Sequence, residues 1–149
     1  MKCYDMLILR KFPLCPVSIE VPLYLESCQA GFPSPAVDYI ERELDLNEYC
    51  IRHPSATFFV RASGHSMSDI GLKDGALMIV DRPETPAHGD VVIAEIDGEF
   101  TVKKLFISAR EPRVTLQAMN PSCAPIYPAP DVLQIFGVVM YFAHKTRDA

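Results

Sequence analysis

The sequence lacks the basic excess that is typical of nucleic-acid-binding proteins. It has 14 lysines and arginines against 19 aspartates and glutamates, which gives a formal net charge of -5, and its pI is about 5.3. Such a chain has no positive field that would attract phosphate backbones or acidic membranes. We therefore expect no direct sequence-specific binding to DNA and no membrane binding.

Paired cysteines and long apolar runs are also missing. The five cysteines are odd in number, widely spaced and never in a CxxC pair, which argues against a disulfide framework or a zinc site. Nowhere does the chain contain the roughly 18 consecutive apolar residues of a membrane helix, and Arg10 and Lys11 interrupt the apolar segment near the N-terminus. These absences predict a cytoplasmic protein with free thiols, no bound metal and no cofactor.

With 149 residues, the chain is long enough for one domain and a short additional arm. Prolines at positions 13, 16 and 22 disfavour a helix in the first thirty residues and favour an extended arm. Residues 28–35 contain Gly31, Pro33 and Pro35 and are predicted to form an exposed linker. After the N-cap candidate Ser34, apolar residues at helical spacing predict a helix over about 35–50, with a break near Asp45.

From His53 onward the pattern changes to short β-strands separated by turns. Six apolar segments are predicted to be strands, namely TFFVRAS, ALMIVDR, DVVIAEI, EFTVKKLF, RVTLQAM and LQIFGVVMYFA. Asp97 and Gly98 form a strong turn signal, so residues 91–107 are predicted to be one antiparallel hairpin. Strands without helices between them indicate a mainly β body of curled, partly closed antiparallel sheets.

Ser66 is a candidate nucleophile, because it follows a strand and lies two residues after Gly64. Glycine permits a backbone geometry that leaves nearby amides exposed, as an oxyanion hole requires. A serine in this position is more commonly part of a polar turn, so the interpretation depends on a base. The histidines at 53, 88 and 144 are in contexts typical of the surface, and His65 is next to Ser66 in an extended stretch, which makes a direct hydrogen bond between them awkward.

The other candidate bases are Lys103 and Lys104. A lysine with its ordinary pKa of about 10.4 is protonated at neutral pH and cannot act as a base. Burial among the neighbouring apolar residues would disfavour the charged form and lower the pKa. Strand alternation places the two lysines on opposite faces, and periodicity does not tell which one is buried. Without further information, the commoner case is that both are solvated lysines that protect a sheet edge.

Several stretches together resemble the UmuD family, within the LexA-like self-cleaving serine/lysine peptidases. They are GFPSPA, LDLNEY, HPSAT, GHSM, LMIVD, HGDVVIA and DGEFTVKKL, and the likeness extends from about Cys28 to about Phe142. The resemblance implies that Ser66 is the nucleophile, Lys103 the general base and Ala30-Gly31 the scissile bond. It thus implies an arm of residues 1–30 that self-cleavage removes, and a peptidase and dimerisation domain of residues 31–149.

The local chemistry is consistent with this assignment. Ala30 is small, Gly31 allows close approach of the backbone, and an extended arm can enter a peptide-binding groove. Neutral Lys103 would take the hydroxyl proton of Ser66, and the backbone N–H groups of Ser66 and Met67 could hold the oxyanion. The Met67 side chain is expected to pack in the core beside the nucleophile.

The resemblance also implies a role in the response to DNA damage. A RecA nucleoprotein filament would stimulate cleavage, and the shortened homodimer would then serve an error-prone Y-family DNA polymerase of the UmuC type. The sequence departs from the UmuD pattern at Ala30, where that family has a cysteine and LexA repressors have alanine. His65 stands where aspartate is common in the family, and no catalytic role is assigned to it.

Two other functions are alternatives to self-cleavage in translesion synthesis. A LexA-type transcriptional repressor needs a winged-helix domain before the cleavage site, and the 30 residues that precede Gly31 here, with three prolines, are too few for one. A non-catalytic binding module with the same fold would not need both Ser66 and Lys103.

Overall fold

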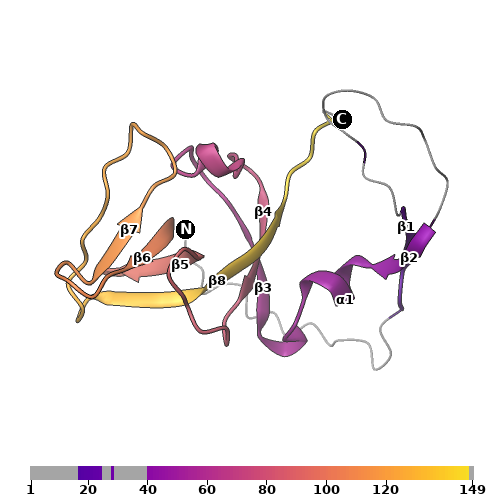
Figure 1. Cartoon of the computed structure of the whole chain (residues 1–149), viewed down its shortest axis with the longest axis horizontal. Helices are drawn as coiled ribbons and strands as arrows, with labels where there is room; N and C mark the ends of the chain where they lie inside the picture. Colours follow the sequence, from indigo (N-terminus) through magenta and orange to yellow (C-terminus); the bar gives the residue numbers. More distant parts are fainter. Residues whose placement is uncertain (1–16, 25–27, 29–39, 148–149) are drawn as a thin grey trace. The chain divides into compact units, whose positions relative to one another are not determined.

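The computed structural model describes residues 17–24, 28 and 40–147. The chain separates into two units, residues 1–49 and 50–149 (Figure 1). In the first unit, strand β1 (Glu20–Tyr24) pairs antiparallel with strand β2 (Ile40–Asp45). The arm is thus extended over residues 20–24, as predicted. Of the predicted linker 28–35 only Cys28 lies within the described residues, and it is exposed.

The predicted helix over about 35–50 is wrong for residues 40–45, which form β2, while residues 35–39 lie outside the described residues. The helix α1 comprises only Leu46–Cys50. Pairing with β1 gives the backbone of residues 40–45 its hydrogen-bond partners, and this tertiary contact overrides the helical spacing of Ile40 and Leu44. The helix that does form begins directly after Asp45, where the sequence predicted a break, but the residues before it are a strand.

Asp45 explains why the helix begins where it does. Its Oδ1 accepts hydrogen bonds from the backbone N–H groups of Asn47 at 2.8 Å and Glu48 at 3.3 Å, which are otherwise unpaired at a helix start. Its Oδ2 accepts from the Ser18 hydroxyl and the Ile19 N–H, both at 3.0 Å. These bonds, that of Ser18 foremost, hold the pKa of Asp45 below its ordinary value.

The second unit is built on a six-stranded antiparallel sheet in the order β3-β4-β8-β5-β6-β7. Its strands are β3 (Thr57–Arg61), β4 (Leu77–Asp81), β5 (Val91–Ile96), β6 (Glu99–Ile107), β7 (Val114–Gln117) and β8 (Leu133–Ala143), with short 3-10 turns at Pro54–Ala56 and Ser68–Ile70. Each of the six predicted strands is confirmed, and the fold is mainly β. Within residues 50–147, β3 and β7 remain the two ends of the sheet, which does not close on itself.

Strand β8 joins the two halves of this sheet. Its first half pairs with β5 and its second half with β4, and the register shifts once in each pairing. Figure 1 shows it as the long yellow strand that continues from β5 to β4. At Gly137 an added Cβ would lie 2.6 Å from Val80 Cγ1 and 3.0 Å from the Asp81 carbonyl oxygen. Glycine is therefore required for the close approach of β8 and β4.

Strand alternation on β5 creates two apolar clusters. Ile93 packs with Met67, Met78 and other residues of one cluster, whereas Val92 and Ala94 pack in the second. The β5–β6 hairpin has the predicted turn, in which Asp97 (φ 50°) and Gly98 (φ 81°) adopt left-handed conformations. Among the residues described, no helix is long and apolar enough to cross a membrane.

Candidate active site

The loop that carries Ser66 begins where β3 ends and is fixed by hydrogen bonds to the two residues that precede β4. The Ala62 N–H donates to the Ala76 carbonyl at 2.8 Å, and the Gly75 N–H donates to the Ala62 carbonyl at 2.9 Å. Gly64 has a φ of +88°, and its N–H donates to Asp74 Oδ1 at 2.7 Å. The conformation at position 64 is one that side-chain-bearing residues rarely adopt, so the turn depends on this glycine.

Ser66 and Met67 follow at the top of this loop, which is called here the Ser66 loop (residues 62–67). The Met67 side chain is 3% exposed and packs in the core, as predicted. Ser66 is half-buried. Within residues 40–147, the backbone N–H groups of Ser66 and Met67 have no hydrogen-bond acceptor.

Lys103, on β6, contacts Ser66. Its Nζ lies 3.2 Å from Ser66 Oγ, 2.8 Å from Thr101 Oγ1 and 3.1 Å from the Val102 carbonyl oxygen. Lys103 is 8% exposed, while the next residue, Lys104, is half-buried and on the opposite face of the strand. The structure therefore separates the two lysines that periodicity left equivalent.

Burial lowers the pKa of Lys103 below its ordinary value, because the apolar surroundings disfavour the ammonium form. A smaller, opposing effect comes from the electrostatic interaction with Cys123, which favours the ammonium form. The lowered pKa increases the fraction of neutral amine, which is the form that can accept a proton from a hydroxyl.

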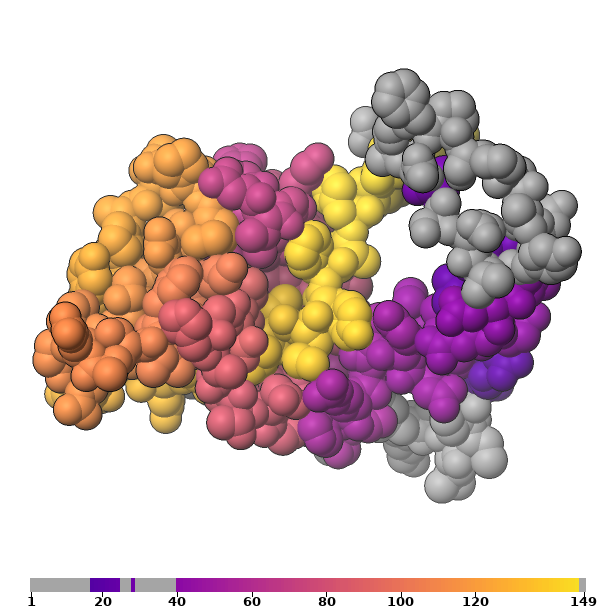
Figure 2. All heavy atoms as spheres, viewed as in Figure 1, coloured from indigo at the N-terminus to yellow at the C-terminus, as the bar shows by residue number. Residues whose placement is uncertain are grey.

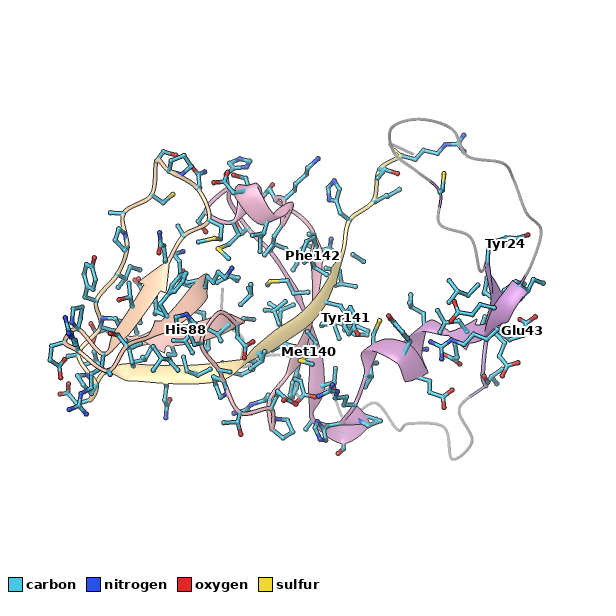
Figure 3. All side chains as sticks on the ribbon, viewed as in Figure 1. Tyr24, Glu43, His88, Met140, Tyr141 and Phe142 are labelled. Carbon is cyan, nitrogen blue, oxygen red and sulfur yellow. The ribbon has the colours of Figure 1, made fainter. Side chains whose placement is uncertain are left out.

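The four histidines are not close partners of this pair. His65 is exposed, and its backbone carbonyl, not its side chain, is used in the loop. His88, labelled in Figure 3, has its Nδ1 3.0 Å from the backbone N of Ile107, which donates to it. His144 is exposed near the C-terminus.

His53 is a surface residue, as the sequence suggested, with a side chain that is 46% exposed, but it also has a buried partner. Its Nδ1 lies 2.7 Å from Oδ2 of Asp81, a carboxylate that is 1% exposed. Sequence reasoning missed this pair because the two residues are 28 positions apart, and the available signal was the acidic residue at the end of the apolar run LMIVD.

Only one group of described side chains has the spacing of metal ligands. His53, Asp81 and Glu84 have ligand atoms within 4.8 Å of one another. Asp81 already accepts from His53 and from the Glu84 N–H, and Arg52 Nη1 lies 3.6 Å from the Glu84 carboxylate. The group is therefore satisfied as a hydrogen-bonded ion-pair network that ties the start of β3 to the end of β4.

The predicted cleavage-site residues Ala30 and Gly31 lie outside the described residues. The structure thus brings together Ser66, Lys103 and the candidate oxyanion amides, and it does not test the position of the scissile bond.

Comparison with known proteins adds a family to this geometry. The Peptidase S24-like family model matches residues 22–140. The chain is 59% identical to protein SamA of Salmonella typhimurium over 132 residues, 89% of this chain and 91% of SamA. It is 55% identical to protein ImpA of Escherichia coli over 85% of this chain and 86% of ImpA, and 48% identical to protein MucA of Escherichia coli over 82% of this chain and 83% of MucA.

Proposed function

The chain belongs to the Peptidase S24-like family, and from that premise we propose that it is a UmuD-type serine peptidase that cleaves its own chain between Ala30 and Gly31. The observation that carries the proposal is the 3.2 Å contact between Lys103 Nζ and Ser66 Oγ in a buried setting. Two residues 37 positions apart are held within proton-transfer distance.

The contacts of Lys103 suit a neutral amine. Such an amine has two N–H donors and one lone pair. The Thr101 hydroxyl oxygen and the Val102 carbonyl can accept the two donors, which leaves the lone pair for the hydroxyl proton of Ser66. In this arrangement Lys103 is the general base that activates Ser66.

The proposed reaction is an acyl transfer. Ser66 Oγ attacks the Ala30 carbonyl carbon as its proton passes to Lys103, and the N–H groups of Ser66 and Met67 stabilise the oxyanion. The lysine then donates that proton to the Gly31 amine as the peptide bond breaks. Water hydrolyses the acyl-enzyme, so the products are the arm of residues 1–30 and a fragment of residues 31–149. Each chain is cut once, so the reaction works as a switch.

The biological setting that we propose rests on the resemblance of the sequence to the UmuD family. A RecA nucleoprotein filament would stimulate cleavage after DNA damage. The shortened chain, as a homodimer, would be an accessory subunit of a UmuC-type Y-family translesion polymerase.

The test is to incubate the purified full chain at mildly alkaline pH, or with an activated RecA filament, and to follow its intact mass. We expect a fragment that begins at Gly31, and none from Ser66→Ala or Lys103→Ala. Lys104→Ala is the matched control and should cut at the wild-type rate, because Lys104 is on the opposite face of β6. Normal cutting by Lys103→Ala, or loss of cutting in Lys104→Ala, would contradict the assignment of the base.

A further inference from the structure

A loop distant in sequence holds the Ser66 loop in place. The segment after β7, residues 118–126, contributes Asn120, whose Nδ2 donates a 2.8 Å hydrogen bond to the His65 carbonyl, 55 positions away. Next to it, the Asp69 N–H donates to the Met119 carbonyl at 2.7 Å. Figure 2 shows these two segments, magenta and orange, in contact at the surface of the second unit.

The orientation of the Asn120 amide is fixed by its other end. Its Oδ1 accepts from the Ser122 N–H at 3.0 Å and from the Ser122 hydroxyl at 2.6 Å. A backbone N–H is always a donor, so the atom that faces it must be the amide oxygen. The NH₂ end therefore faces the His65 carbonyl, and the hydrogen bond to His65 does not depend on an arbitrary choice of amide orientation.

The bond to His65 acts on the peptide unit that contains the Ser66 N–H. A trans peptide unit is planar, and its C=O and N–H point in opposite directions. When Asn120 and the Ser68 N–H (3.2 Å) both donate to the His65 oxygen, they set the plane of the His65–Ser66 peptide. That plane sets the direction of the Ser66 N–H, one of the two candidate oxyanion donors.

The other side of the loop is held at a different peptide. Asp74 Oδ1 accepts from the Gly64 N–H at 2.7 Å. This N–H belongs to the Ser63–Gly64 peptide, two peptide units before the His65–Ser66 peptide. Asp74 therefore fixes the entry to the loop, and Asn120 fixes the peptide that leads into Ser66.

From these contacts we infer that Asn120 is a positioning residue for self-cleavage, which orients the Ser66 N–H toward the oxyanion by its hydrogen bond to the His65 carbonyl. This inference rests on the proposed function. Asn120 acts on the oxyanion donor and not on the base, because its contact is with a backbone carbonyl and the amine of Lys103 is held separately by Thr101 and Val102.

The experiment compares self-cleavage rates of the full chain across a pH series by intact-mass kinetics. For Asn120→Ala we expect the plateau rate to fall about ten- to a hundredfold, the range for a displaced transition-state contact. The midpoint of the pH profile should stay at the wild-type value, because Lys103 is untouched. Asn120→Asp is nearly isosteric and keeps both acceptor contacts with Ser122, but it lacks the donor, so it should be as slow as Asn120→Ala.

Gln117→Glu is the matched control. In this variant an exposed amide near the same loop becomes a carboxylate, and the rate of self-cleavage should stay within about twofold of wild type.

Three results would overturn the inference while leaving the proposed function intact. The first is a wild-type rate in both Asn120 variants, and the second is a wild-type rate in Asn120→Asp alone. The third is a slow Asn120→Ala variant that also has a shifted pH midpoint or that has lost its folded state in circular dichroism. If the wild-type chain does not cut, or if Ser66→Ala cuts equally well, the proposed function fails and this inference fails with it.

Discussion

Lys103 Nζ lies 3.2 Å from Ser66 Oγ and 2.8 Å from Thr101 Oγ1, so a single buried amine connects the Ser66 loop to a hydroxyl on its own strand. Because Thr101 and Lys103 are two positions apart on β6, their side chains are on the same face of the strand.

The rate of self-cleavage should rise with pH, with a midpoint below the ordinary lysine pKa of 10.5. Burial lowers the pKa of Lys103, and the reaction needs its neutral form, so the rate follows the fraction of deprotonated amine. Intact-mass kinetics of the full chain over a pH series will measure the midpoint. A midpoint at or above the value of an unburied lysine would contradict the assignment.

Thr101→Val should move this midpoint to lower pH. The Thr101 hydroxyl oxygen accepts a hydrogen bond from Lys103, and such a bond stabilises the ammonium more than the neutral amine. Valine has nearly the same shape and no acceptor, so the charged form becomes less favourable. The plateau rate should fall by about threefold to tenfold, because the amine is also held less firmly. Thr101→Ser keeps the acceptor and is the matched control, with a midpoint close to that of wild type.

Lys103→Met should abolish cleavage and increase the free energy of unfolding near neutral pH by about 1 kcal/mol, which corresponds to roughly 4 °C in melting temperature. A buried ammonium is costly, and methionine fills a similar volume without charge.

The free energy of unfolding of the wild type should also rise with pH between the lowered folded-state pKa of Lys103 and 10.5, because in that range unfolding takes up a proton.

Urea unfolding at several pH values will measure both effects. In Lys103→Met the rise with pH should be smaller than in wild type. Lys104→Met is the control, and its stability should stay within about 0.5 kcal/mol of wild type, since the Lys104 side chain is half-exposed. A destabilised Lys103→Met variant would contradict the view that the lysine is kept at a cost to stability.

His53→Ala should lower the free energy of unfolding by about 1 to 3 kcal/mol, because it removes a partner of the buried Asp81 carboxylate. Arg52→Ala is the matched control from the same network. The ion pair between Arg52 and Glu84 is 3.6 Å long, and the Arg52 side chain is 66% exposed, so its loss should cost no more than about 0.5 kcal/mol. Equal losses in the two variants, measured by urea unfolding, would argue against a special role of the His53–Asp81 pair.

The strands of the second unit could be predicted from the sequence because their signals are local. Alternating apolar residues and the Asp97-Gly98 turn define β5 and β6 without reference to the rest of the chain. Residues 40–45 were predicted to be helical because their apolar spacing fits a helix. Their pairing with β1, about 20 positions earlier, cannot be read from that spacing.

The features of the candidate site likewise fall into those that local sequence predicts and those that depend on the fold. Local patterns in the chain were enough to identify the residues available for chemistry: a serine after a glycine, two adjacent lysines on a strand, and the family-like motifs around them. The folded chain was needed to show that Lys103 and not Lys104 is buried beside Ser66, that Asn120 reaches the His65 carbonyl, and that His53 pairs with Asp81. The physical reason is that burial, which sets the pKa of an amine, and hydrogen bonds between distant segments depend on how the sheet brings its strands together.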